Sequence, residues 1–471
     1  MNSNLKRAIS IFLGPALFGL MLLVLPAEFT LEMRGAIGTL LWMVCWWLFP
    51  PCAYPVIGFL PMAINALLPM IKMSTIIAQY TSTSCIMVLC GMIILASWSV
   101  TGLDKRIATS FLYLVGTSAR SQSIFWYLLA VILSSFLPNL VVAATIIPIA
   151  YSMLKYCGLQ SIRESKAASL IMMVIPWGAT VGGLTTPLGS SSNIVIIDYI
   201  EQVIGREYYY TDWVIRFLPI IITLVAINVL FIFVISPKNL SLPGSREYLL
   251  SVRNELGKMK KNEWISLVLF VVAAVLAFTR NLYADLLPGL QPAYSFVICA
   301  ILLFLIPGEG GKPIAEWKQI TPEVNWGLLY MFGGALALGE LLTGTEADVV
   351  FGAILSGAGV HGEFMVVFIV LAFTLTISDL TSNGATAAMC MPIILTMAAA
   401  LKINPIPLIY VGSIGVSLSY TMPTSIRAIS VGYGLEPAFM VKRGFVLSVI
   451  VIPSLSFLCY MLMKYWPTFL T

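Results

Sequence analysis

The chain has 471 residues, of which 59% are hydrophobic and only 10% are charged, and its net charge is +5. Apolar segments of about 20 residues recur from end to end, and a segment of this length can cross the ~30 Å hydrocarbon core of a bilayer as a helix. The composition therefore predicts an all-α polytopic membrane protein. A positive charge of this size is typical of basic cytoplasmic loops and does not suggest nucleic-acid binding.

The eight cysteines lie mostly in apolar segments and form no CxxC pair and no Cys/His cluster. Isolated cysteines in such segments are typical packing residues. We therefore expect no metal site, no disulfide framework and no cofactor.

The first half of the chain, residues 1–235, is predicted to form one repeat. Its first apolar segment, Ile9–Leu25, has the look of a signal peptide, but many spans follow it, which favours a retained first helix. Further scaffold spans are expected at 35–50, 54–70, 83–101 and 107–117. They are followed by a hairpin at 124–156, a helix broken in its middle at 165–200 and a last span at 212–235.

The most polar stretch is residues 236–263, which carry six Lys/Arg and three Glu. By the positive-inside rule this linker is expected in the cytoplasm, together with the Asp104–Arg106 turn. A second repeat, residues 264–471, follows the linker, with spans expected at 264–282, 293–306, 325–344, 348–358 and 443–464. A second hairpin at 363–402 and a second broken helix at 406–436 precede the last of these.

Two stretches in the predicted hairpins match each other without gaps: FLPNLVVAATIIPIA (136–150) and LTSNGATAAMCMPII (380–394). Asn139 falls on Asn383 in this alignment. Each half also has a second interruption, TTPLGSSSNIVI (185–196) or YTMPTSIRAISV (420–431). Two broken segments per half at corresponding positions predict two inverted repeats with re-entrant helical hairpins, and a site where the breaks line a cavity.

The breaks have the chemistry of an anion site. Helices that begin at a break direct unsatisfied N–H groups, with partial positive charge, at whatever lies between them, and such N-termini bind carboxylates. Amides and hydroxyls surround them, although a single Ser or Thr could instead bond a carbonyl of its own helix. The expected substrate-binding residues are Asn139, Ser190, Ser191, Asn193, Ser382, Asn383, Gly384, Thr424, Ser425 and Arg427.

Arg427 is the most informative of these residues. An arginine in an apolar, small-residue segment costs several kcal/mol unless it is paired or hydrated. One interpretation is a structural ion pair, with Asp379 as the nearest partner by topology. The other is a fixed positive charge that offsets a bound dianion, because guanidinium binds a carboxylate with two parallel hydrogen bonds. The single histidine, His361, lies in a Gly-flanked turn and is expected to be a solvated loop residue.

With these tips and breaks, and with the TGLDKRIA turn at 101–108, essentially the whole chain resembles the divalent anion/sodium symporter family, the INDY-like dicarboxylate transporters related to solute carrier family 13. The resemblance implies a homodimer in the cell membrane whose transport domain moves as an elevator past a scaffold domain. It also implies that Asn139 and Asn383 contact substrate carboxylates. Ser134, Asn139 and Gly189 would fall at the first sodium site, and 382–384 at the second.

The sequence departs from the family pattern at both tips and both breaks. The first tip reads PNL at 138–140 and lacks the Ser and Thr hydroxyls, and the second reads SNG at 382–384 and lacks the Thr. The first break has serines for two prolines, and the second has Arg427 where Asn is expected. A guanidinium would repel a nearby sodium ion by several kcal/mol. We therefore expect the sodium positions Ser134 and Gly189 to be vestigial and the chain to belong to a sodium-independent exchanger branch.

A mechanism follows from the charge of Arg427. Moving an empty site with an unpaired cation through low dielectric is costly, and a bound C4–C5 dicarboxylate would neutralise the charge, so the expected activity is dicarboxylate:dicarboxylate antiport. The nearest alternative is a sodium-coupled symporter of dicarboxylate, citrate or sulfate. An anion channel is a third reading. An intramembrane hydrolase, and with it any enzyme activity, is disfavoured because the sole histidine lies outside the Ser-rich breaks.

Overall fold

The computed structural model describes residues 3–26, 29–110, 116–159, 161–237, 240–347 and 362–471. These residues form helices and two isolated bridge contacts, without a strand. Eight helical segments among them are long and apolar enough to cross a membrane. The prediction of an all-helical polytopic membrane protein is therefore confirmed for this part of the chain. The span expected at 348–358, His361 and the middle of 107–117 lie outside the described residues.

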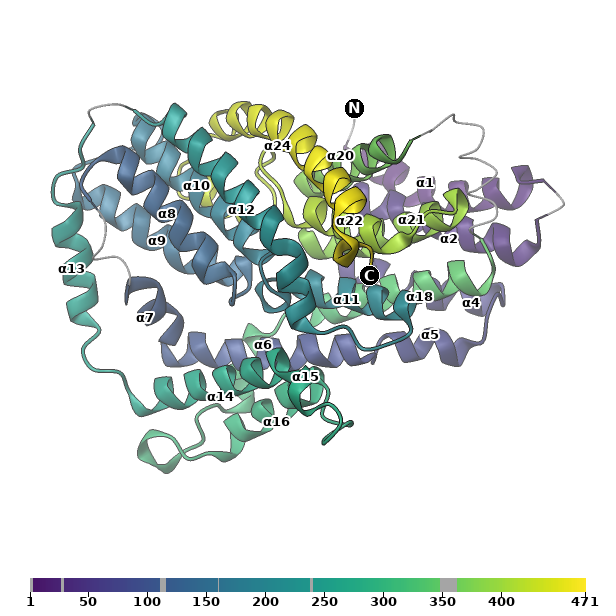
Figure 1. Ribbon diagram of the computed structural model, residues 1–471, viewed down its shortest axis with the longest axis horizontal. Coiled ribbons are helices and arrows are strands. Elements are labelled where there is room, and N and C mark those ends of the chain that lie inside the picture. The colour runs from purple at the N-terminus through teal and green to yellow at the C-terminus, as the bar shows by residue number, and fades with distance from the viewer. Residues whose placement is uncertain (1–2, 27–28, 111–115, 160, 238–239, 348–361) are drawn as a thin grey trace.

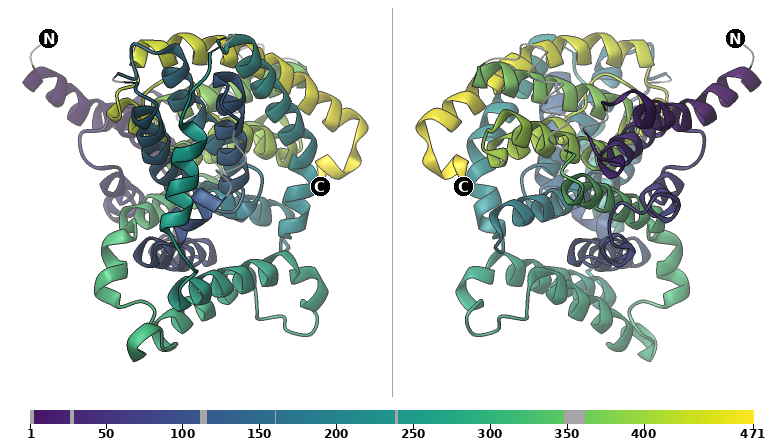
Figure 2. Two further views of the ribbon diagram at one scale, coloured as in Figure 1. Left: turned by 90° about the vertical axis from the view of Figure 1, so that its left-hand side faces the viewer. Right: turned by 90° about the vertical axis from the view of Figure 1, so that its right-hand side faces the viewer.

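An outer group of helices forms the lower edge and the right-hand side of Figure 1. Helix α2 packs on α18, and α14 and α16 pack on α6. Helices from the two halves of the chain therefore contact each other within the outer group. The N-terminal α1 projects from the rest of this group (Figure 2). The outer group comprises α1 (Ser3–Val24), α2 (Leu31–Leu48), α3 (Tyr54–Ile57), α4 (Leu60–Leu67), α5 (Met73–Gln79), α6 (Thr83–Thr101), α14 (Lys261–Phe278), α15 (Arg280–Tyr283), α16 (Pro292–Leu305), α17 (Trp317–Ile320) and α18 (Trp326–Gly344).

Residues 54–70 form two short helices instead of the single span expected from their hydropathy. Pro55 and Pro61 lie in the first turns of α3 and α4. Proline lacks the N–H that a helix interior needs and is tolerated in the first turn, where that N–H has no helical partner. The two prolines therefore set the starts of two helices where apolar content alone indicated one.

A central group of helices repeats the same order of elements in both halves of the chain. A helical hairpin comes first, then a helix interrupted by a break, then a long helix. In the first half these are α8 (Ala119–Ser134), α9 (Asn139–Tyr156), α10 (Lys166–Gly183), α11 (Ser191–Ile204) and α12 (Tyr210–Ile235). In the second half they are α20 (Glu363–Leu380), α21 (Asn383–Leu401), α22 (Pro405–Ser417), α23 (Ile426–Gly432) and α24 (Pro437–Tyr465). We call residues 184–190 the first break and 418–425 the second break.

The hairpin tips have sequence features that end one helix and start the next. Pro138 is the N-cap of α9 and has an extended backbone conformation, and a residue before proline is itself disfavoured in the helical region. At the second tip, the Ser382 hydroxyl accepts a hydrogen bond from the Ala385 N–H (3.3 Å), which supplies a partner to one of the free N–H groups of the first turn.

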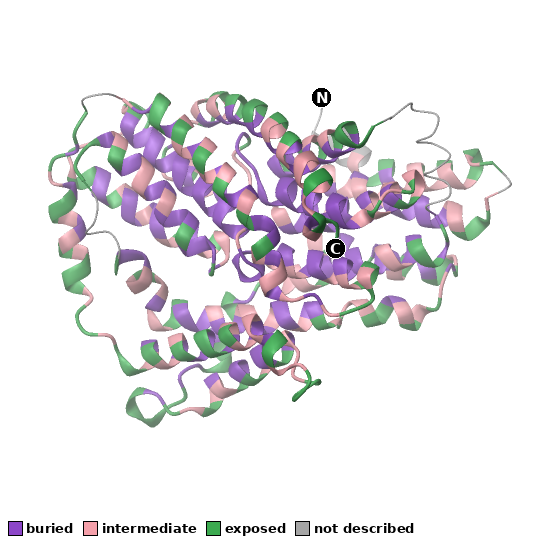
Figure 3. Cartoon of the chain, viewed as in Figure 1, coloured by how far each residue is buried: buried purple, intermediate pink, exposed green. Residues whose placement is uncertain are grey.

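The first halves of both broken helices are enclosed by protein. Every residue from Ala167 to Gly183 in α10 and from Ile406 to Ser417 in α22 is buried, and Figure 3 shows this buried material in the middle of the molecule. A helix that is apolar on all sides is buried in this way. The breaks at the ends of α10 and α22 therefore begin inside protein.

Glycines allow these two helices to approach their hairpins closely. A Cβ atom at Gly182 of α10 would collide with the carbonyl of Val131 on α8, and one at Gly415 of α22 would collide with Thr374 on α20. Small residues at such contacts let helix backbones pack tightly in membranes. Both halves therefore use the same close packing between broken helix and hairpin.

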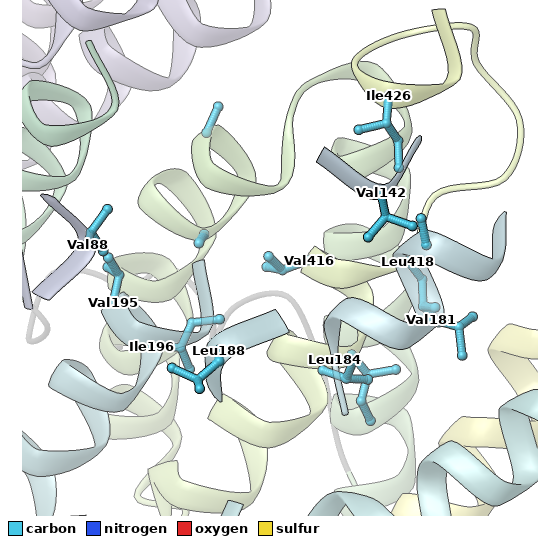
Figure 4. Packing of buried hydrophobic residues seen from close by; sticks show 14 of the residues in the cluster. Val88, Val142, Val181, Leu184, Leu188, Val195, Ile196, Val416, Leu418 and Ile426 are labelled. Atoms are coloured by element: carbon cyan, nitrogen blue, oxygen red, sulfur yellow. The ribbon is translucent and has the colours of Figure 1, made fainter. Parts of the chain in front are cut away.

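The two halves also interlock in the central group. Helix α10 packs on α23, and α11 packs on α21 and α22. The Ser430 hydroxyl of α23 donates to the Met172 carbonyl of α10 (2.6 Å). Figure 4 shows Ile426 beside Val142, where α23 packs on α9. Each break is thus surrounded by helices from both halves.

The polar linker contains a helix that the sequence did not indicate, α13 (Ser245–Glu255), which packs on α9 and on α7 (Leu103–Ser110). Arg106 of α7 pairs with the buried Glu263 (3.0 Å) and donates to the carbonyls of Leu256 and Gly257. The Asp104–Arg106 turn is therefore fixed to the end of the linker.

Candidate functional site

Three residues expected at the first sodium position converge on Gly183, the last residue of α10. A Cβ atom built at Gly183 would lie 3.4 Å from the Gly189 carbonyl oxygen, 3.5 Å from Asn139 Nδ2 and 3.7 Å from Ser134 Oγ. Gly189 lies so close to the end of α8 that a Cβ atom built on it would be 2.5 Å from the Ser134 carbonyl oxygen. The first hairpin tip and the first break therefore form one compact unit.

Asn193 bridges the first break from the first turn of α11. Its buried side-chain amide donates to the carbonyls of Gly183 (2.7 Å) and Thr186 (2.9 Å). Its Oδ1 atom has no hydrogen-bond partner, and neither has the buried Thr185 hydroxyl. Buried acceptors normally have a partner, and those without one call for a bound ion, water or ligand. The first break thus presents several neutral oxygen atoms, two of which, Asn193 Oδ1 and the Thr185 hydroxyl oxygen, have no partner.

The serines of the first break differ in their surroundings. The hydroxyls of Ser190 and Ser192 lie 2.7 Å apart and satisfy each other. Ser191 borders a small apolar cavity between the first tip and the outer group. That cavity is also lined by Pro138, Leu188, Ile194, Met87, Val88, Gly91, Met92, Leu95, Phe270 and Phe296.

The second hairpin tip resembles the first. Asn383, the first residue of α21, has its Nδ2 atom 3.5 Å from the Ser417 carbonyl at the end of α22, just as Asn139 lies beside Gly183 at the end of α10. Gly384 faces α18, where a Cβ atom would lie 2.8 Å from Met331 Cε. Packing of the tip on the outer group therefore leaves little room for a side chain at Gly384.

The second break is held by Asp379, in the last turn of α20. Its Oδ1 accepts from the N–H groups of Tyr420 (2.7 Å) and Thr421 (2.9 Å), and its Oδ2 accepts from the Thr421 hydroxyl (2.6 Å). The Thr424 hydroxyl donates to the Asp379 carbonyl (2.8 Å). Because a bilayer offers no partners for irregular backbone, these bonds replace the ones that the break lacks.

Arg427 lies in the first turn of α23, directly after the second break, and is only 1% exposed. Its Nε donates to the Met422 carbonyl (2.5 Å), and its Nη2 donates to the Thr424 hydroxyl (2.8 Å) and the Asp379 carbonyl (3.1 Å). Nη1 donates to the Ser419 hydroxyl. Nη2 also lies 3.9 Å from Asp379 Oδ1, so the structure contains the ion pair that the sequence allowed. A direct contact of Arg427 with substrate stays a prediction.

Arg427 and Asn193 have corresponding positions. Arg427 is ten residues after Ser417, the end of α22, and Asn193 is ten residues after Gly183, the end of α10 (427 − 417 = 193 − 183 = 10). Asn193 reaches back across its break to the Gly183 carbonyl, and Arg427 reaches back to the Met422 carbonyl within its break. The second break is therefore bridged by a cation where the first is bridged by a neutral amide.

Ser425 is the most exposed of the predicted hydroxyl residues of the second break and has a strained backbone. Its φ of 51° is one of three positive values outside glycine among the described residues. Side chains other than glycine are rare in this region, and such strain is concentrated at functional sites. The Thr424 hydroxyl, in contrast, donates to the Asp379 carbonyl and accepts from Arg427 Nη2.

Some polar groups near the breaks were not anticipated. Ser378 corresponds to Ser134 in the gap-free alignment, since both lie five residues before the tip asparagine, and extending the alignment by two residues would have found it. The Ser417 hydroxyl is buried and has no partner. The Trp177 indole N–H donates to the Tyr420 carbonyl (3.0 Å). That bond connects α10 with the second break, and no local sequence pattern predicts it.

Apolar side chains close the surroundings of both breaks. Figure 4 shows Leu184 and Leu188 at the first break and Val416 and Leu418 at the second. No group of three or more His, Cys, Asp or Glu that could hold a metal occurs in the part of the chain that the structure describes. At the first break, the groups available to a cation are neutral oxygens such as those around Gly183.

A family model described as the sodium:sulfate symporter transmembrane region matches residues 5–471. The chain belongs to this family. The sodium:sulfate symporter family consists of multi-pass membrane transporters, which confirms the expectation of a transporter rather than an enzyme and the resemblance at the level of the family.

Relatives within the sodium:sulfate symporter family match most of the chain. The sodium-dependent dicarboxylate transporter SdcS of Staphylococcus saprophyticus is 26% identical over 471 residues, covering 95% of this chain and 90% of the relative. SdcS of Staphylococcus aureus strain NCTC 8325 is 26% identical over 445 residues, covering 91% and 85%. The crystal structure of the YdaH transporter of Alcanivorax borkumensis is similar in fold, with a TM-score of 0.53, 14% identity and 84% and 88% of the two chains covered.

Proposed function

We propose that this chain is a secondary active transporter of C4–C5 dicarboxylates of the succinate, malate, fumarate and 2-oxoglutarate type in the cell membrane. The observation that carries the proposal is the pair of asparagine-tipped hairpins, each joined to a broken helix in the buried centre of the molecule. The substrate class follows the names of the SdcS relatives. Citrate and sulfate are the alternative anions.

The helix ends at the breaks suit a dianion. Helices α9, α11 and α21 all begin at a tip or break, at Asn139, Ser191 and Asn383, and their free N–H groups carry partial positive charge. In our proposal the two asparagine amides and these N-termini bind the two carboxylates. The two halves are inverted repeats, and the central group moves as an elevator against the outer group within a homodimer.

The first break favours coupling to sodium. The Asn193 Oδ1 atom is buried without a partner in a region of neutral carbonyl and hydroxyl oxygens, which are suitable ligands for a hard monovalent cation. Sodium bound here would be transported with the substrate, as the names of the relatives indicate for those proteins. We therefore place sodium symport, with one ion at the first break, ahead of exchange.

Dicarboxylate exchange is the second candidate, and the cation in the second break favours it. Arg427 occupies the space between the second tip and the second break, where a guanidinium would repel a sodium ion. Exchange requires that substrate, and not Asp379, balances the charge of Arg427. The 3.9 Å ion pair with Asp379 weakens this requirement.

The experiment is flux of labelled succinate into liposomes that contain the purified protein. Symport predicts uptake into empty vesicles under an inward sodium gradient and none without sodium. Exchange predicts uptake only into vesicles preloaded with dicarboxylate, with or without sodium. Saturable uptake of sulfate but not of succinate would contradict the proposed substrate class, and unsaturable flux without either driving force would indicate a channel.

A further inference from the structure

Asp379 connects the helix before the second hairpin tip to the second break through several hydrogen bonds. Its carboxylate accepts three hydrogen bonds from Tyr420 and Thr421, and its own carbonyl accepts two more from Thr424 and Arg427. It is 6% exposed and lies four residues before Asn383. One residue thus holds three positions of the break, and Arg427 of α23, against the helix that ends at the tip.

The corresponding position in the first half of the chain shows which of these hydrogen bonds occur only in the second half. Ser135 corresponds to Asp379, since both lie four residues before the tip asparagine, and its carbonyl accepts a hydrogen bond from the hydroxyl of Thr186 in the first break. The backbone connection therefore occurs in both halves. The Ser135 hydroxyl bonds only to Val131 of its own helix (2.9 Å), so at this position the first half has a hydroxyl that does not reach into the break where the second half has a carboxylate that does.

We propose that Asp379 is a positioning residue that fixes the second break to the second tip, so that Asn383 and the exposed part of the break face the substrate in one fixed arrangement. This inference rests on the proposed function. A buried carboxylate that accepts several N–H and O–H bonds is strongly oriented, and sub-ångström placement of binding groups controls substrate affinity and turnover.

The same carboxylate balances the charge of Arg427 internally. Removing one partner of a buried pair leaves an uncompensated charge, whereas replacing both partners removes the charge together with the bonds. Asp379→Asn keeps an oxygen acceptor of the same size but removes the charge. The double variant Asp379→Asn/Arg427→Gln restores neutrality, so it should recover what the single variant loses.

The test is the concentration dependence of succinate uptake in proteoliposomes, with the amount of folded protein measured by size-exclusion chromatography. Asp379→Asn is expected to raise KM about tenfold, which corresponds to about 1.4 kcal/mol of binding free energy. The double variant is expected to return KM to within about threefold of the wild type. Thr421→Val, which removes only the donor to Oδ2, is expected to raise KM about threefold. The control is Thr376→Val, one turn earlier on the exposed side of α20, whose hydroxyl bonds only to Ala372 of its own helix.

A KM that is unchanged in the folded fraction of Asp379→Asn, with only the yield reduced, would show a structural role and overturn the inference. A lower KM would show that a freed Arg427 binds the dianion, which also overturns it. A double variant no better than Asp379→Asn would contradict the internal charge balance. If Asp379→Asn does not fold, an unchanged KM for Thr421→Val would count against positioning. A wild-type protein that takes up no dicarboxylate contradicts the proposed function instead.

Discussion

At the scale of single residues, glycines and an asparagine build the first break. Gly183 and Gly189 bring two turns of backbone together at the tip of the first hairpin, and Asn193 fastens the broken helix across the gap. The sequence indicated Gly189 and Asn193 because they match a family pattern, whereas it gave no reason to single out Gly183. The structure adds the physical reason, which is that a side chain at Gly189 has no room beside the Ser134 carbonyl.

Replacing Gly189 tests this packing. A Cβ atom 2.5 Å from a backbone oxygen has to displace the backbone, and overpacking of this kind costs about 1–3 kcal/mol. Gly189→Ala is expected to lower the melting temperature of the detergent-solubilised protein and to abolish most succinate uptake. Gly19→Ala, in a helix position with nothing within 4 Å, is the matched control and should retain both properties. A Gly189→Ala protein as active as the control would contradict the close approach.

At the scale of elements, the two broken helices are built alike and bridged differently. Helix α11 is tied to α10 by the neutral amide of Asn193, and α23 is tied to the second break and to α20 by the guanidinium of Arg427. If sodium binds at the first break, its ligands belong to the segment that Asn193 fastens. A change at Asn193 should therefore affect the cation more than the substrate.

Asn193→Ala removes two donated hydrogen bonds and the unpartnered oxygen. The expected result is a loss of about 1–3 kcal/mol in stability, because two buried carbonyls lose a partner, and the disappearance of any stabilisation by sodium in thermal unfolding. Asn325→Ala, at an exposed asparagine before α18 that makes no capping bond, is the control. Equal stabilisation of Asn193→Ala and wild type by sodium would place the cation elsewhere.

How far the sequence predicts the structure differs from feature to feature. The apolar runs, the matched stretches at 136–150 and 380–394 and the interruptions at 185–196 and 420–431 indicated hairpins and broken helices, because hydrogen-bond requirements in a bilayer are local and severe. The prolines that divide 54–70 and the helix α13 were missed, since hydropathy does not report them. The bonds of Asp379 to the second break join residues 41 to 48 positions apart, and only the packing of α20 on α22 brings them together.

At the scale of the whole molecule, the central and outer groups meet through a small number of polar contacts. Arg280 of α15 binds Glu207 in the loop between α11 and α12 (2.9 Å) and donates to the carbonyls of Leu287 and Pro288. The hydrogen bond to Glu207 raises the pKa of Arg280. Tyr199 of α11 donates to the Ala335 carbonyl of α18 (3.0 Å). If the central group slides, both contacts have to break in every cycle.

Glu207→Gln weakens the contact with Arg280 and should therefore speed the exit from the conformation described here. The expected result is a maximum uptake rate about threefold higher with KM within twofold of the wild type, because only the barrier between conformations changes. The control is Glu436→Gln, which removes the exposed pair with Arg163, whose side chains are 37% and 68% exposed. Such surface pairs contribute little. An unchanged rate in Glu207→Gln would show that this contact does not limit the transport cycle.

The enclosure of α10 and α22 has a consequence for how the chain is made. A ribosome delivers these segments to the membrane in order, yet the 13 residues of α22 are too few to span a bilayer, and in the folded protein they are enclosed by other helices. They can take up their position only after α20 and α21 have folded, because they pack on both helices. In the first half, α10 depends in the same way on packing against α8. Membrane insertion of this protein is thus inseparable from its tertiary folding.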